Sequence, residues 1–147
     1  MVMALRPWLR APIMPGENRR AGREEALQIL YAIDVGSRDP GEAIDEVVAE
    51  NARADHRRFV RDLVLGTIDF AAQADEIIAP VLEGWTIERL PEIDRLVLRM
   101  ATYELRRTPD VPRAVVINEA VELAKRFSTE DSGRFVNGVL NAIARRS

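Results

Sequence analysis

Three arginines lie close together near the start of the chain, and their chemistry suits binding to phosphates. Arg19 and Arg20 are adjacent, and Arg23 follows one helical turn later. A guanidinium group stays charged at every relevant pH, binds phosphate through two parallel hydrogen bonds and stacks on bases. The same cluster is also compatible with a plain solvated surface, so the residue types alone leave both interpretations open.

The charge of the chain is distributed unevenly. The 147 residues carry a net charge of −3, which argues against a uniformly basic nucleic-acid-binding protein. Residues 1–23, however, contain five arginines and one glutamate, whereas residues 39–50 contain five acidic side chains and no basic one. A Debye length of about 10 Å confines the influence of each patch. A basic N-terminal segment can therefore engage phosphates although the body of the protein is acidic.

Catalytic chemistry is not indicated by the residues. His56, the one histidine, stands beside two arginines at an expected helix start, and we predict that it is exposed and non-catalytic. The chain has no cysteine, so it has neither a thiolate nucleophile nor a cysteine-based zinc site. Neither a dinucleotide-binding glycine loop nor a P-loop sequence occurs. We therefore predict a non-enzymatic protein with no cofactor and no metal site.

The chain has the composition of a soluble protein. Hydrophobic residues make up 47%, which is enough for a core, and charged residues make up 31%. The longest apolar run is far shorter than the roughly 20 residues that span a bilayer. Arg6, Pro7 and Arg10 interrupt any apolar signal region at the start. We expect a cytoplasmic protein without a membrane partner.

Apolar residues recur at three- and four-residue spacings along most of the chain, which predicts an all-α fold. No segment shows the alternation of a strand. We expect about seven helices in two small bundles. They cover about residues 19–35, a short stretch after Pro40, 55–79, a turn at 86–90, 91–107, and a pair within 113–145.

The expected domain organisation follows from where this periodicity is absent. Residues 1–17 contain three prolines and a glycine, and we interpret them as a flexible leader. Residues 18–147 then form one helical domain, with an N-terminal bundle over about 18–80 and a C-terminal bundle over about 81–147. Pro80 and Gly84 mark the junction, and Trp85 is expected to pack as a lid on the second half.

One charged residue lies on an apolar face of the first expected helix. Arg23 shares its stripe with Leu27 and Leu30, and a charge inside a core is costly. We therefore expect this helix to project past its neighbours, so that Arg23 lies at an exposed mouth and can face a ligand.

Gly66 interrupts the stripe of the third helix at a cost of about 1 kcal/mol relative to alanine. A close crossing with another helix would explain it.

Three separate motifs carry a resemblance to a known family. INEAVELAKRFSTEDSGRFVNGVLNAI closely resembles the C-terminal signature of the NusB family of bacterial transcription antitermination factors. RRAGREEALQILY and RLPEIDRLVLRMATYEL match further family segments, in the expected order. The resemblance covers about residues 19–144 and implies the all-α NusB-like fold.

The resemblance also implies an RNA-binding surface. The arginine-rich N-terminus of the family contacts single-stranded boxA RNA, and Arg19, Arg20 and Arg23 match it. The aromatic residue that matches Phe135 lies near RNA in the family, where a base could stack on it. Helical spacing instead places Phe135 in the core. We favour partial exposure.

Further RNA-contact candidates lie beside Phe135 or on the preceding helices. Arg134 supplies positive charge, and Asp131 either caps the last helix or accepts hydrogen bonds from base edges. Arg99 lies off the apolar stripe of its helix and is a secondary RNA candidate.

The resemblance implies a protein partner as well. In the family this partner is NusE, the tenth small-subunit ribosomal protein acting outside the ribosome. By resemblance, Asp94 and the helix Glu92–Tyr103 lie on that interface, and an acidic face suits a basic partner. Tyr31 is either a core residue or a partly exposed ring at the partner surface, and the sequence leaves both open.

The motifs together predict a transcription antitermination factor. It would bind boxA-type RNA with NusE and help to hold an antitermination complex on RNA polymerase during rRNA transcription. One alternative is a helical protein–protein adaptor without an RNA role. Another is a stand-alone relative of the RNA-binding domain of rRNA cytosine methyltransferases, whose catalytic domain we do not find in these 147 residues.

Overall fold

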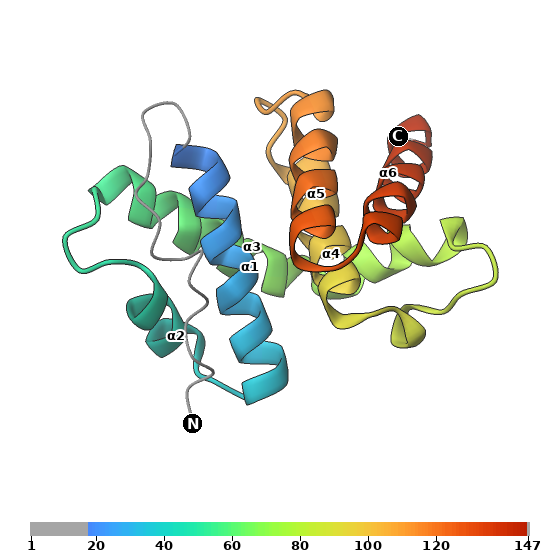
Figure 1. The fold of residues 1–147 in the computed structure, drawn as a ribbon. Helices are drawn as coiled ribbons and strands as arrows, with labels where there is room; N and C mark the ends of the chain where they lie inside the picture. Colours follow the sequence, from blue (N-terminus) through green and yellow to red (C-terminus); the bar gives the residue numbers. More distant parts are fainter. Residues whose placement is uncertain (1–17, 147) are drawn as a thin grey trace. The chain divides into compact units, whose positions relative to one another are not determined.

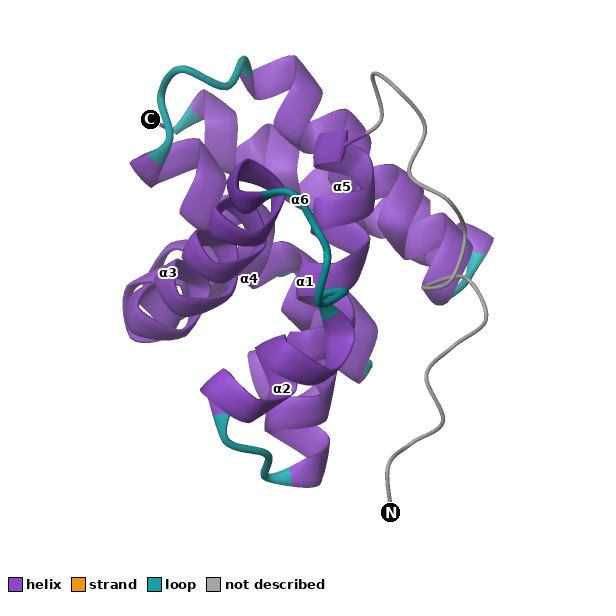
Figure 2. Cartoon of the chain, turned by 90° about the vertical axis from the view of Figure 1, so that its left-hand side faces the viewer, coloured by secondary structure: helices purple, strands orange, loops and turns teal. Residues whose placement is uncertain are grey.

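The computed structural model describes residues 18–146, which fold into helices joined by short loops (Figure 1). No strand occurs among these residues (Figure 2). Their elements are α1 (Asn18–Gly36), α2 (Pro40–Val47), α3 (Ala54–Ile78), η2 (Ala79–Val81), η3 (Ile87–Arg89), α4 (Glu92–Arg107), α5 (Arg113–Phe127) and α6 (Glu130–Arg145). The predicted all-α fold and the order of its helices are confirmed. The short turn expected at residues 86–90 is the 3₁₀ helix η3.

The chain divides into two compact units, and the division falls inside α3. One unit ends at Leu65 and the other begins at Gly66, whereas the sequence suggested a junction near residue 80. The difference arises because α3 is one continuous helix of 25 residues. Its first part belongs to the first unit and its second part to the second. The leader predicted for residues 1–17 lies outside the described residues.

The first unit has an apolar core drawn from three helices. Asp39 is the N-cap of α2: its Oδ2 accepts a hydrogen bond from the Glu42 amide at 3.1 Å, and Pro40 follows at the first helical position. The buried apolar residues of this unit are Ala26, Leu27, Ile29 and Leu30 of α1, Ala43 and Ile44 of α2, Val48 just after it, and Val60, Leu63 and Val64 of α3.

The second unit is built around α4, α5 and α6, which pack against one another. The N-cap of α6 is Thr129, because its Oγ1 accepts a hydrogen bond from the Ser132 amide at 2.9 Å. The buried apolar residues of these helices are Leu96, Val97, Leu98, Met100 and Ala101 of α4, Val116, Ile117, Ala120, Leu123 and Ala124 of α5, and Val136, Val139, Leu140 and Ile143 of α6.

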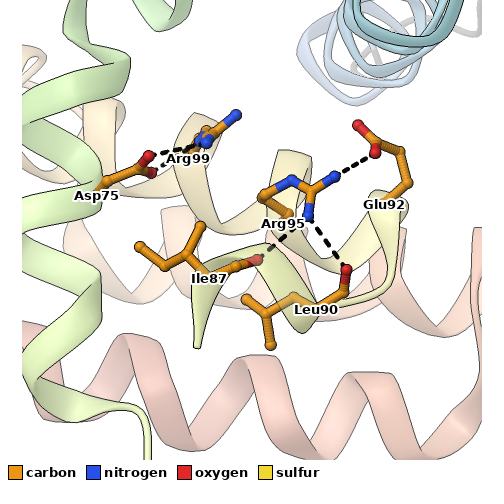
Figure 3. A network of polar contacts seen from close by, with 6 residues as sticks. All are labelled: Asp75, Ile87, Leu90, Glu92, Arg95 and Arg99. Carbon is orange, nitrogen blue, oxygen red and sulfur yellow. Dashed lines mark hydrogen bonds and ion pairs between the residues drawn. The ribbon is translucent and has the colours of Figure 1, made fainter. Parts of the chain in front are cut away.

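Arg95 of α4 holds the segment that precedes its own helix (Figure 3). Its Nη1 donates to the carbonyl oxygens of Ile87 and Leu90, at 3.2 Å each, and its Nη2 contacts the Glu92 carboxylate. Because these carbonyls belong to the first residue of η3 and to the residue that follows it, their hydrogen bonds to a charged donor fix η3 against the start of α4.

Trp85 does not pack as the predicted lid. Its side chain is 52% exposed, and it lies in the loop between η2 and η3, directly after Gly84 with its positive φ of 79°. Ile87 and Leu90 are the buried residues of this segment instead. Periodicity cannot orient a residue in such a loop, so the lid prediction was wrong.

Gly66 is the site of a close helix contact, as predicted. A Cβ atom at this position would lie 2.2 Å from Cζ and 2.3 Å from Oη of Tyr103 on α4. Tyr103 also meets Phe70 edge to face, with ring centroids 6.1 Å apart. The missing side chain therefore lets the tyrosine ring lie directly on the backbone of α3.

We expect Gly66→Ala to destabilise the protein although alanine favours helix. Overpacking against the Tyr103 ring costs about 1–3 kcal/mol, which exceeds the gain of about 1 kcal/mol in helix propensity. Gly138→Ala is the matched control, because a Cβ at that exposed helical position meets nothing within 4 Å. Urea unfolding should show a less stable Gly66 variant and a slightly more stable Gly138 variant. Equal gains in both would contradict the tight contact.

None of the helices in residues 18–146 combines the length and the apolar character that crossing a membrane requires.

Candidate functional site

The first turn of α1 presents two of the three predicted arginines to solvent. Arg19 and Arg20 are both exposed. The guanidinium carbon of Arg19 lies 4.2 Å from the centroid of the Phe59 ring on α3. A cation over an aromatic face is attracted by the ring quadrupole. Arg19 is thus held by an uncharged partner while its charge stays accessible.

Arg23 is buried, so its predicted place at an exposed mouth is wrong. Its side chain is only 4% exposed, and its guanidinium carbon lies 5.5 Å from the centroid of the same Phe59 ring. The ring provides a favourable contact for the cation, and the aliphatic stem of an arginine packs well in apolar surroundings. Arg23 therefore helps to build the first unit and does not extend into solvent.

The start of α6 carries three further predicted RNA-contact residues. Asp131 and Arg134 are exposed and form an ion pair with each other, one helical turn apart. Asp131 lies in the first turn of the helix, where a negative charge is favourable, although Thr129 is the cap. Phe135 is half-buried, which lies between the two alternatives of core packing and full availability to a base.

The guanidinium of Arg99 forms an ion pair with a carboxylate of α3. Its Nε donates to Asp75 Oδ1 and its Nη2 to Asp75 Oδ2, both at 2.8 Å (Figure 3). This is the two-bond geometry with which an arginine would otherwise bind a phosphate. The contact ties α4 to the second part of α3, so the arrangement favours a structural role for Arg99.

Asp94 lies inside the second unit, and its predicted position on a surface is wrong. It is only 4% exposed, and its Oδ2 accepts a hydrogen bond from Ser132 Oγ of α6 at 2.9 Å. Ser132 Oγ also lies 2.8 Å from Ser128 Oγ. Glu104, another acidic residue of α4, is buried as well. Two of the acidic side chains of α4 are therefore buried inside the second unit and are not presented on an acidic surface.

Tyr31, the other predicted partner residue, is half-buried near the end of α1. A partly exposed tyrosine combines apolar area with a polar tip, which is the composition common at protein interfaces. The ring is thus partly exposed, and its contact with a partner stays a prediction.

His56 is buried, so the prediction of an exposed histidine was wrong. It is 7% exposed, and its Nε2 lies 3.0 Å from Glu25 Oε1 of α1. Burial raises the pKa of the Glu25 carboxyl above its ordinary value, while the hydrogen bond and the charge of His56 oppose that rise. The pair joins α1 to α3. Within the described part of the chain, no group of three or more acidic, histidine or cysteine side chains is placed to hold a metal ion.

Sequence reasoning missed Phe59, which it treated only as part of an apolar stripe. A usable signal was present in α1. Arg19, Gly22 and Arg23 are spaced i, i+3 and i+4, which places two cations and a gap on one helix face. Such a face suits an aromatic ring from another helix.

Ser132→Ala should destabilise the protein because it removes the donor to a buried carboxylate. Leaving a buried polar group without its partner costs about 1–3 kcal/mol. Asp131→Ala, next to it on the exposed face, loses a surface ion pair and a helix-end interaction worth about 0.3–1 kcal/mol. Urea unfolding of both variants should place Ser132→Ala clearly lower. A lower stability of Asp131→Ala than of Ser132→Ala would contradict the assignment of Ser132 as the partner of Asp94.

Stability should depend on pH through Glu25. Because its folded-state pKa is raised, the folded protein holds this proton more tightly than the unfolded chain. The stabilising contribution is complete below the ordinary pKa and is lost as the pH rises through the folded-state value. Glu25→Gln has no such loss, so its unfolding free energy should improve relative to that of the parent as the pH rises above the ordinary glutamate pKa of about 4.

The matched control for this titration is Glu50→Gln, which neutralises an exposed carboxylate. Both variants remove one negative charge, so the difference between their unfolding free energies reports the burial of Glu25. An unfolding free energy of Glu25→Gln that runs parallel to that of the parent as the pH rises would show that burial does not destabilise the ionised Glu25 carboxylate.

Comparison with known proteins shows to which family the chain belongs. The model of the NusB family matches residues 20–145. The transcription antitermination protein NusB of Pelotomaculum thermopropionicum is 46% identical over 129 residues, which cover 86% of this chain and 88% of that protein.

Solved structures share the fold. T. maritima NusB superposes with a TM-score of 0.81 at 37% identity, covering 86% of this chain and 90% of that one. A chain from the crystal structure of the antitermination factors NusB and NusE in complex with dsRNA also gives 0.81, at 32% identity, over 89% of this chain and 98% of that one. Since the family model covers residues 20–145 and these relatives share both sequence and fold with it, the chain belongs to the NusB family.

Proposed function

We propose that this protein is a transcription antitermination factor that binds RNA together with NusE. The observation that carries the proposal is the exposed arginine turn at the start of α1, in a chain that matches the NusB family over residues 20–145. A relative of 32% identity has been crystallised with NusE and dsRNA. The partners are inferred from family membership. The exposed arginines in the first turn of α1 provide the charged groups that would bind RNA.

Phosphate contacts are assigned first to Arg19 and Arg20, the exposed members of the cluster. In the second unit, Arg134 offers a further exposed cation, and the half-buried Phe135 offers part of an aromatic ring. A single strand can present both phosphates and unpaired bases to such groups. We therefore propose single-stranded boxA-type RNA as the ligand.

Other residues of the predicted surface would act indirectly. Arg23 packs beside Phe59, and Arg99 is bound to Asp75, so both shape their units. Asp94 fixes the start of α6 through Ser132. Asp131 holds Arg134 by their ion pair. Tyr31 remains the proposed contact for NusE.

The proposed mechanism is assembly and involves no catalytic step. Two modest contacts, one made by this protein and one by NusE, gain from effective concentration when they lie on the same RNA. The joint complex would then hold the antitermination machinery on RNA polymerase during rRNA transcription. Bacterial rRNA transcription takes place in the cytoplasm, and we propose that the protein is located there.

The test is RNA binding measured by fluorescence anisotropy across a salt series, with and without NusE. Contact with about four phosphates of a single strand predicts a log–log slope near −3. Arg19→Ala/Arg20→Ala should weaken binding and bring the slope closer to zero by about 1.4. Arg145→Ala/Arg146→Ala removes an equal charge from an exposed pair at the end of α6 and should bind like the parent.

Two outcomes would change the proposal. Absence of RNA binding under every condition, with NusE binding intact, would leave only a protein–protein adaptor. Tighter binding to a duplex of the same sequence would replace the single-stranded ligand with double-stranded RNA, the form present in the relative's crystal structure.

A further inference from the structure

One aromatic ring in the first unit contacts three residues of a single helix face. Phe59 of α3 is half-buried, and its ring lies 4.2 Å from the Arg19 guanidinium carbon and 5.5 Å from that of Arg23. Gly22 stands between these arginines on α1. The i, i+3, i+4 spacing places all three on one side of the helix. Phe59 therefore lies beneath the turn that carries the arginine cluster.

Gly22 makes this contact possible. A Cβ atom at Gly22 would lie 2.5 Å from Cδ2 and 2.7 Å from Cε2 of the Phe59 ring, closer than real Cβ atoms approach. The ring therefore sits directly on the helix backbone, in a place that no other residue type would leave open. An aromatic ring packed this closely has little freedom to turn away from the cations beside it.

A ring contact suits an arginine that must bind phosphate. The hydrogen-bond donors of a guanidinium lie in its plane, at its edge, while its faces can stack on an aromatic group. Arg19 is exposed, and its described partner is a ring that takes up none of these donors. Holding the side chain before RNA arrives also lowers the conformational entropy that binding costs.

We propose that Phe59 is a positioning residue of the RNA-binding surface, which orients the Arg19 guanidinium for a phosphate. This inference rests on the proposed RNA-binding function and adds a residue to it. The simpler explanation is that Phe59 only packs the first unit. The two differ in what they predict for folded protein, because a packing role changes stability without a specific link to Arg19.

The first test compares Phe59→Leu and Phe59→Tyr in RNA anisotropy at fixed salt. Leucine keeps an apolar side chain but removes the ring, and should weaken RNA binding about two- to five-fold, the range expected for an exposed cation–π contact. Tyrosine keeps the ring and should bind like the parent. Phe70→Leu is the control, because it removes a second ring that lies 5.1 Å from an arginine, Arg107, in the other unit.

The decisive measurement is a double-mutant cycle with Arg19→Ala. If Phe59 acts through Arg19, Phe59→Leu should have no further effect on RNA affinity once Arg19 is absent. Phe59→Leu alone should also keep the parental salt slope, whereas Arg19→Ala moves it toward zero by about 0.7. Circular dichroism and NusE affinity confirm that each variant is folded.

Three results overturn the inference. These are parental RNA affinity in Phe59→Leu, an equal loss from Phe59→Leu with and without Arg19, and a loss in Phe59→Tyr as large as in Phe59→Leu. Failure of the underlying function is recognised separately, because the parent protein itself would then bind no RNA. Failure of the inference instead appears only in the variants, with the parent binding intact.

Discussion

The close approach of an aromatic ring to a glycine is the constraint on which both compact units depend. In the first unit, the Phe59 ring of α3 lies on Gly22 of α1, and in the second, the Tyr103 ring of α4 lies on Gly66 of α3. Helix α3 thus contributes a ring to one contact and a glycine to the other. Because a ring on bare backbone tolerates almost no displacement, each contact fixes the register of its helix pair.

Hydrogen bonds and ion pairs of charged side chains add further contacts between the helices. Asp94 accepts from Ser132, Arg99 binds Asp75 with two hydrogen bonds, and Glu25 meets His56. A buried charge without a partner is costly, so each of these contacts constrains both helices that supply it. Several residues that match the family motifs thus make contacts within their own units, and we propose that they support the RNA-binding surface and do not lie on it.

Helices and their starts could be predicted because their causes are local. Asp39 and Thr129 each accept from an amide three residues later, and Gly66 broke an otherwise regular stripe. The errors at Arg23, His56 and Asp94 have the opposite cause. Glu25 and His56 are 31 residues apart, and Asp94 and Ser132 are 38 apart. Periodicity shows which side of a helix faces a neighbour, but it does not show that the neighbour offers a matching partner.

Two of the exposed cations of the proposed RNA surface, Arg19 and Arg134, differ in what holds them, and this difference bears on how RNA would bind. Arg134 is held by the carboxylate of Asp131, whereas Arg19 is held by the ring of Phe59. A phosphate must compete with Asp131 for the donors of Arg134, although an exposed ion pair is worth only about 0–1 kcal/mol. The Phe59 ring, the partner that the described residues provide for Arg19, contacts the guanidinium and accepts none of its hydrogen bonds. The α1 turn should therefore supply the stronger phosphate contact, and Arg134 an adjustable one.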